Sequence, residues 1–215
     1  MSKSTAQVYD NLMKKIFLII LLAFTTSTSF AYLSLNESAE ILPDNYFNLG
    51  FAPQTFLSNG GGFDASVFAD THIYDNTDAR ITIGGGEIDF WTQASVKWVP
   101  FPDVDNQPAM GLRGAIGYSR DEDQNYMHLQ ISPILSKKSL TSMHDMLPYV
   151  GLPITYVMEK GNNYVATQVS LGAIWFPWNV AQVGAEFNLN LKNSISSASV
   201  FMNFPFEGAT GYKKY

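Results

Sequence analysis

The chain has 215 residues, enough for one compact domain, and a formal net charge of −6. It has no cysteine, which excludes a disulfide-stapled scaffold and a thiolate metal site. Nucleic-acid binding needs clustered lysine and arginine to neutralise phosphates, and this acidic chain lacks such clusters. We therefore expect no nucleic-acid partner, and no pattern in the sequence predicts a cofactor or a metal ion.

The first 31 residues have the layout of a secretory signal peptide. A basic head at residues 13–15 precedes an apolar run at 16–24, and a small-residue stretch then leads to Ala31. We expect cleavage after Ala31, with translation starting at Met1 or at Met13. The alternative is a membrane anchor, but the apolar run is far shorter than the roughly 20 residues that a spanning helix needs.

After a mixed stretch at residues 32–44, expected to be a short periplasmic lead-in, apolar residues recur with a period of two. Segments of about ten alternating residues, separated by turn residues, are typical of transmembrane β-barrels. The sequence predicts one barrel over residues 45–206, followed by a tail at 207–215. The alternating segments are 47–51, 63–73, 88–98, 110–119, 126–132, 149–156, 164–175, 181–191 and 197–206.

Alternation alone does not tell which face of the sheet lies inside. The polar row is rich in glycine, serine, asparagine and glutamine, and the apolar row is nearly free of charge, which favours a polar interior and a lipid-facing exterior. In an up-and-down topology, aromatic residues also gather near both sets of turns, as interfacial girdles do. The predicted fold is an all-β, antiparallel, up-and-down transmembrane β-barrel. The predicted girdle residues are Trp98, Trp175, Trp178, Tyr118, Tyr126, Tyr156 and Tyr164.

Two strand counts fit the pattern. Separate strands at Arg80–Gly84 and Glu87–Val99, joined by the Gly84–Gly86 turn, give ten. Merging these two and omitting the strand at Asn45–Ala52 gives eight. We favour ten, because a merged strand would be about twice as long as a tilted span requires.

The end of the chain resembles a known class of protein. Most bacterial outer-membrane barrels finish with a strand whose alternate residues are hydrophobic and whose last residue is phenylalanine. Val200, Met202, Phe204 and Phe206 look like this assembly signal, although the tail at 207–215 departs from the usual ending. By size, the chain is similar to small Gram-negative barrels of the OmpA-transmembrane or OmpW-like kind. The resemblance implies an outer-membrane location, contact with lipid and lipopolysaccharide, and insertion by the barrel-assembly machinery.

The polar row carries charged residues that must pair or be hydrated inside a narrow barrel. We expect them to form a network that plugs the lumen, and the alternative is a narrow conduit for small solutes. The expected function is thus non-enzymatic and structural, in the cell envelope, and the sequence predicts no oligomeric state. Two alternatives stay open, a membrane-embedded barrel hydrolase and a soluble exported ligand-binding barrel. The expected interior residues are Asp64, Asp70, Asp89, Lys97, Arg113, His128 and Glu186.

Overall fold

Antiparallel strands dominate the computed structural model, which describes residues 34–58, 61–139, 145–178 and 180–208. No helix within these ranges is long and apolar enough to cross a membrane. The strands are β1 (Tyr46–Phe56), β2 (Phe63–Tyr74), β3 (Thr77–Gly86), β4 (Phe90–Phe101), β5 (Ala109–Asp121), β6 (Gln124–Ser136), β7 (Met146–Gly151), β8 (Ile154–Glu159), β9 (Asn162–Trp178), β10 (Ala181–Lys192) and β11 (Ser197–Glu207).

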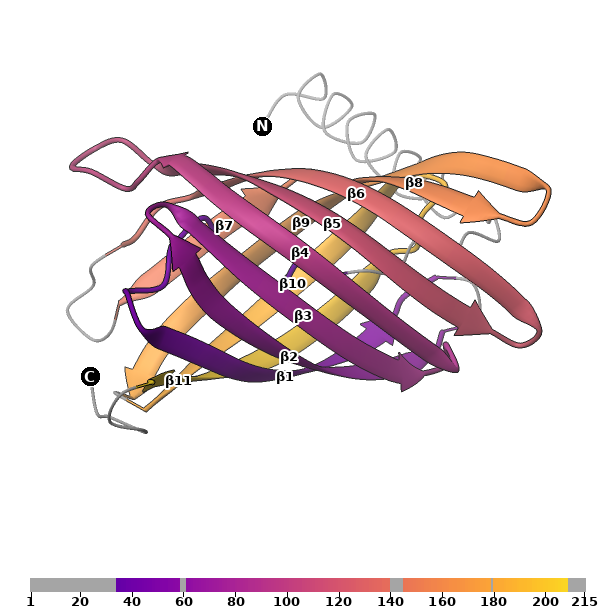
Figure 1. Ribbon diagram of the computed structural model, residues 1–215, viewed down its shortest axis with the longest axis horizontal. Coiled ribbons are helices and arrows are strands. Elements are labelled where there is room, and N and C mark those ends of the chain that lie inside the picture. The colour runs from indigo at the N-terminus through magenta and orange to yellow at the C-terminus, as the bar shows by residue number, and fades with distance from the viewer. Residues whose placement is uncertain (1–33, 59–60, 140–144, 179, 209–215) are drawn as a thin grey trace, which may run out of the picture.

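The strands close into a barrel in sequence order (Figure 1). β11 pairs with β1, and β9 pairs with β10, so the sheet has no free edge. β7 and β8 are two halves of one strand, since both pair with β6 on one side and with β9 on the other. The break falls at Pro153, which has no N–H to donate to the ladder. The barrel is therefore ten-stranded, as expected. The expected turn at Gly84–Gly86 is misplaced, because these glycines end β3 and the turn to β4 lies at residues 87–89.

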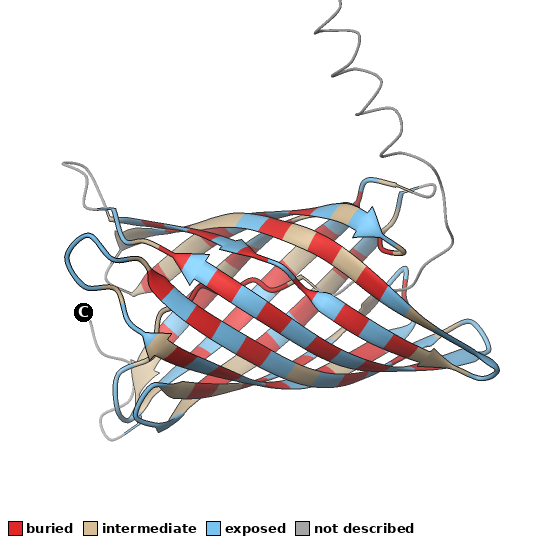
Figure 2. Ribbon diagram, turned by 90° about the horizontal axis from the view of Figure 1, so that it is seen from above, coloured by how far each residue is buried: buried red, intermediate tan, exposed pale blue. Residues whose placement is uncertain are grey.

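Burial alternates along every strand (Figure 2). On β10, Phe187 and Leu189 are 55% and 47% exposed, whereas Glu186 and Asn188 are 0% and 1% exposed. Because successive side chains of a strand point to opposite faces, the apolar row lies outside the barrel and the polar row inside. This is the orientation that the sequence predicts.

The turns fall into two groups at opposite ends of the barrel. We call the end with the turns at 75–76, 102–108, 137–145 and 179–180 the terminal rim, because β1 begins and β11 ends there. The other end, the far rim, has the turns at 57–62, 87–89, 122–123, 160–161 and 193–196. At the far rim, an interior cluster of apolar side chains lies under the turns: Phe56, Ile88, Trp91 and Ile195.

Candidate functional site in the barrel interior

The chain before β1 lies inside the barrel. We call residues 34–42 the interior segment. The backbone of Leu35 and Asn36 is held from two strands. The Glu186 carboxylate accepts hydrogen bonds from their N–H groups, at 2.9 and 2.8 Å, and Arg80 Nη1 donates to their carbonyl oxygens. The expected periplasmic lead-in at 32–44 is thus wrong for residues 34–42, which lie in the lumen, whereas Pro43 and Asp44 are exposed. A buried backbone without secondary structure needs such partners.

Glu37 of the interior segment meets two cations from the barrel wall. Its Oε1 lies 2.5 Å from Arg113 Nε, and its Oε2 lies 3.5 Å from Lys97 Nζ. The two terminal nitrogens of Arg113 donate to the amide oxygens of Gln93 and Gln130. All three charged side chains are less than 10% exposed, so the carboxylate and the two cations compensate one another away from water.

Glu186 is the centre of a second cluster. Its Oε2 accepts from the hydroxyl of Tyr149 at 2.6 Å, and its Oε1 accepts from Asn188 Nδ2 at 2.9 Å. Asn188 also bonds to Ser170 and Ser34. The carboxylate therefore has four hydrogen-bond donors, two from the interior segment and two from the wall, which stabilise a fully buried charge.

Six of the seven expected interior residues lie inside the barrel and are less than 9% exposed: Asp64, Asp70, Lys97, Arg113, His128 and Glu186. Asp89 is the exception, because it lies exposed in the turn between β3 and β4. Ile88 next to it turns inward instead, and its N–H donates to Asp64 Oδ1 at 3.1 Å. The expected single strand from Glu87 to Val99 begins only at Phe90, so the alternation assumed for its first residues was wrong.

Three charged interior residues were not predicted, namely Glu37, Asp78 and Arg80. Arg80 forms a two-point ion pair with Asp70, at 2.5 and 2.9 Å, and its guanidinium lies 4.1 Å from the centre of the Phe68 ring. Asp70 and Arg80 face each other directly on β2 and β3. The same alternation of inward and outward residues, if applied to residues 78–82, would have placed Arg80 in the polar row opposite Asp70.

The histidines do not assemble a complete catalytic triad among the described residues. His128 Nε2 lies 2.7 Å from Ser119 Oγ, on neighbouring strands, and its Nδ1 has no hydrogen-bond partner in the described part of the chain. His72 does not meet Asp70. Its two ring nitrogens lie near Asp78 and Asp44. His144 lies outside the described residues.

The predicted aromatic girdle is partly wrong. Tyr126 is 1% exposed and Tyr164 is half-buried, and both point inward, where they pack with Val157 and Ala166. The side chain of Trp178 lies outside what the structure describes. The remaining girdle residues are exposed, two toward each rim: Trp98 and Trp175 at the terminal rim, Tyr118 and Tyr156 toward the far rim.

The last strand presents its apolar row outward, as expected. Val200 is 53% exposed and Phe204 is 38% exposed, while Met202 and Phe206 are partly covered. Phe206 stacks on Phe47 of β1, with ring centroids 5.7 Å apart. The assembly role of this strand stays a prediction.

Two loops are joined at the terminal rim, outside the strands. Lys137 Nζ lies 2.5 Å from Asp103 Oδ1, and the N–H of Lys138 donates to Asp103 Oδ2. The hydrogen bond from Lys137 holds the pKa of Asp103 below its ordinary value. This contact connects the 102–108 turn to the 137–145 turn.

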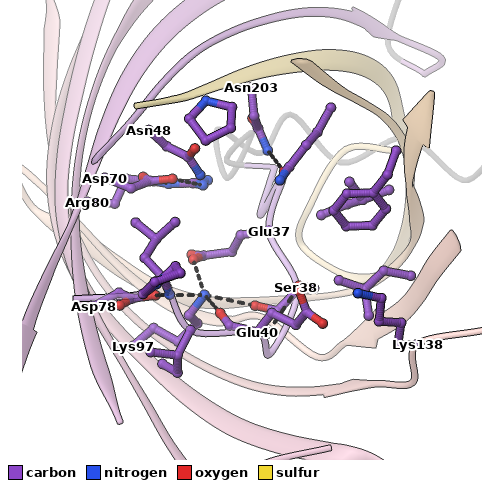
Figure 3. Close-up of a pocket in the computed structure, with 18 of the residues that line it drawn as sticks. Glu37, Ser38, Glu40, Asn48, Asp70, Asp78, Arg80, Lys97, Lys138 and Asn203 are labelled. Atoms are coloured by element: carbon purple, nitrogen blue, oxygen red, sulfur yellow. Dashed lines mark hydrogen bonds and ion pairs between the residues drawn. The ribbon is translucent and has the colours of Figure 1, made fainter. Parts of the chain in front are cut away.

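A cavity of about 390 Å³ lies beside the interior segment, toward the terminal rim (Figure 3). One wall carries Asn48, Asp70 and Asn203 from three neighbouring strands, β1, β2 and β11. The lining also includes Leu147 of β7 and Phe176 of β9. The interior is therefore filled in its centre but keeps a space of ligand size at one end.

Comparison with known proteins gives similarity of fold only. No protein-family model matches the sequence, and no curated protein matches it. A bacterial polysaccharide outer membrane secretin aligns with a TM-score of 0.44 and 11% identity, over 76% of this chain and 66% of that chain, just under two thirds of its length. The translocator domain of the autotransporter NalP from Neisseria meningitidis aligns with a TM-score of 0.39 and 12% identity, over 94% of this chain and 98% of that one. Neither alignment assigns a function.

Proposed function

We propose that the protein is an integral outer-membrane β-barrel with a structural role in the envelope, and that its own interior segment closes its lumen. One observation carries the proposal: each strand has large apolar side chains exposed on the outside of a closed barrel whose interior is polar. A small soluble barrel has the opposite arrangement. Representative outward side chains on successive strands are Leu49, Val67, Ile81, Val96, Ile116, Leu129, Val150, Ile154, Leu171, Phe187 and Val200.

The exterior supports a lipid environment on energetic grounds. Soluble monomers rarely expose continuous apolar patches larger than a few hundred Å². Each Å² of apolar surface that stays exposed to water is less favourable than the same area buried, by about 25 cal/mol. A closed barrel also satisfies every backbone hydrogen bond along the sheet, which hydrocarbon requires. Lipid acyl chains would cover this belt, with lipopolysaccharide as the expected neighbour in the outer leaflet.

The interior supports a sealed barrel over an open conduit. Glu37 of the interior segment pairs with Arg113 and Lys97, which face each other on the adjacent strands β5 and β4. The apolar side chains of Leu35 and Ala39 pack against the wall. With ten strands, little lumen remains once a chain segment and its partners fill it. Slow passage of small solutes would require the interior segment to move.

Cell fractionation with a heat-modifiability gel tests the proposal. We expect the protein in the detergent-extracted outer membrane, and we expect folded and boiled samples to migrate differently. Recovery from the periplasmic fraction without detergent would overturn the membrane assignment and would favour a soluble exported barrel.

A second candidate, a membrane-embedded hydrolase, has one observation in its favour: the contact between Ser119 and His128. Such a pair could activate the serine hydroxyl. Both side chains are less than 5% exposed, however, which leaves a substrate no approach. We expect no turnover of phospholipid or peptide by the purified protein. Turnover that is lost in Ser119→Ala and in His128→Ala would establish this second function instead.

A further inference from the structure

The cavity near the terminal rim has two buried acceptor atoms without donors. Asn48 and Asn203 are 6% and 3% exposed, and the Oδ1 atom of each accepts no hydrogen bond from the described residues. Both line the cavity, and they come from adjacent strands, β1 and β11 (Figure 3). Buried acceptors usually have a partner, so these two oxygens are positioned to bind a ligand that donates hydrogen bonds.

The charge of the lining favours a cation. Five acidic and three basic residues line the cavity: Glu37, Glu40, Asp70, Asp78 and Asp145 against Arg80, Lys97 and Lys138. The three basic residues each form an ion pair within this set. For the carboxylate of Glu40, no hydrogen bond or ion pair is found among the residues of the described ranges, and Glu40 is only partly buried. Glu37 also pairs with Arg113, which lies outside the lining, so the negative charge left without a partner is that of Glu40, in the same lining as the two amide oxygens.

Another part of the lining is apolar and includes an aromatic ring. Leu147, Ile174 and Phe176 lie there. Lys138 Nζ lies 5.5 Å from the centre of the Phe176 ring, so this ring already faces one ammonium group. Such a surface accommodates the carbon chain of a ligand whose charged end meets the polar wall.

We propose that this cavity binds a small organic amine in its ammonium form. The N–H groups donate to Oδ1 of Asn48 and of Asn203, Glu40 compensates the charge, and the carbon chain packs on Phe176. The cavity volume of about 390 Å³ is within the range of small-molecule sites. A metal ion fits less well, because no group of three His, Cys, Asp or Glu side chains in the described residues is placed to hold one. A neutral polyol would leave the excess charge unmatched. The inference rests on the cavity and not on the membrane assignment.

Isothermal titration calorimetry on the purified, detergent-solubilised barrel tests it, with n-butylamine as the probe. We expect saturable binding of one n-butylamine per chain, and no saturable heat with glucose or with calcium chloride. Absence of saturable binding by n-butylamine would overturn the proposal. Equal binding of glucose would also overturn it, since the site would then recognise hydroxyl groups, and equal binding of calcium would show an unspecific acidic site.

Variants then locate the bound amine. Asn48→Ala and Asn203→Ala should each weaken binding about tenfold or more, because each removes a hydrogen bond to a charged donor. Glu40→Gln should weaken it as well. Asn163→Ala, an exposed asparagine beside the far-rim turn of β9, is the matched control and should leave binding unchanged. Heat-modifiability shows whether each variant is folded. Folded variants at Asn48, Asn203 and Glu40 that bind as the wild type does would refute the assignment.

Discussion

At the scale of single residues, Glu37 decides the charge balance of the lumen. Glu37→Gln keeps the shape of the side chain but leaves Arg113 without its carboxylate partner. Loss of one partner from a buried ion pair leaves the other charge buried without compensation. We therefore expect a loss of about 3 kcal/mol in the free energy of unfolding. Urea unfolding in detergent micelles, followed by tryptophan fluorescence, measures it.

The matched control for this change is Asp123→Asn, which also removes one carboxylate but in an exposed turn of the far rim. It should alter stability by less than about 0.5 kcal/mol. If the two variants unfold at the same urea concentration, the interior ion pairs contribute nothing to stability.

The sequence identified most wall charges but not their partners. Lys97, Arg113 and Glu186 could be placed inside because each stands in the polar row of an alternating strand. Glu37 could not, because the interior segment has no repeating pattern, and only the closed barrel brings it to Arg113. Asp89 was wrongly predicted to lie inside. It lies in a turn, where side chains no longer point alternately in and out, although apolar and polar residues still alternate in the sequence.

At the scale of elements, inward aromatic rings lie across glycines of the adjacent strand. Four directly opposed pairs show this arrangement: Phe68 with Gly50, Trp91 with Gly84, Tyr149 with Gly172, and Phe201 with Gly184. In each pair, a Cβ added to the glycine would overlap the ring. The glycines of the polar row therefore make room for the rings, and the ring covers backbone that a glycine leaves bare.

Gly184→Ala tests this pairing. Phe201 is 0% exposed, and a Cβ on residue 184 would overlap its ring, so we expect a loss of about 1–3 kcal/mol in the free energy of unfolding from overpacking. Gly114→Ala is the control, because nothing lies within 4 Å of the added Cβ there. Thermal or urea unfolding of both variants gives the comparison. A partial recovery in the double variant Gly184→Ala with Phe201→Leu would confirm that the ring is the cause, and equal stability of the two glycine variants would contradict it.

The last strand permits a test of the assembly signal. Phe206→Ser removes the final aromatic residue of β11, and Phe47→Ser removes the ring that stacks on it from β1. Both variants lose the same contact, but only the first changes the last strand. If the apolar row of β11 guides insertion, Phe206→Ser should lower the amount of folded protein in the membrane severalfold more than Phe47→Ser does, as measured by quantitative heat-modifiability. An equal decrease would show that rim packing, and not a signal, is responsible.

The bounds of some strands could be predicted from the alternation of apolar and polar residues within the strand itself. The period of two in β9, β10 and β11 depends only on which residues face lipid and lumen, so these strands were predicted closely. Tyr126 and Tyr164 were assigned to the girdle because they border far-rim turns, but their positions in the inward rows of β6 and β9 decide their direction. Position along a strand and side of the strand are separate properties, and the girdle requires both.

At the scale of the whole molecule, the interior segment connects the stability of the barrel to its permeability. It contacts β3, β4, β5, β6 and β10 through Arg80, Lys97, Arg113, Ser136 and Glu186. It also bonds to β1 and β11 through Gln54 and Ser199. A segment tied to seven of the ten wall strands supports the wall as well as filling the lumen. The sequence did not predict this role, because an irregular stretch ahead of a barrel is equally compatible with a place outside it.

Replacement of residues 34–42 by a glycine–serine segment of equal length should open the lumen, since it removes Glu37, Leu35 and Ala39 together. In planar bilayers we expect no conductance steps from the wild type and discrete steps from the replaced form. Glu186→Gln is a milder variant. It weakens the hydrogen bonds that the side chain accepts from the N–H groups of Leu35 and Asn36, and it should give rarer openings. Asp123→Asn should stay closed. A replaced form that is folded by heat-modifiability but still does not conduct would assign the seal to the apolar far-rim cluster around Trp91 instead, and steady conductance of the wild type would exclude a sealed barrel altogether.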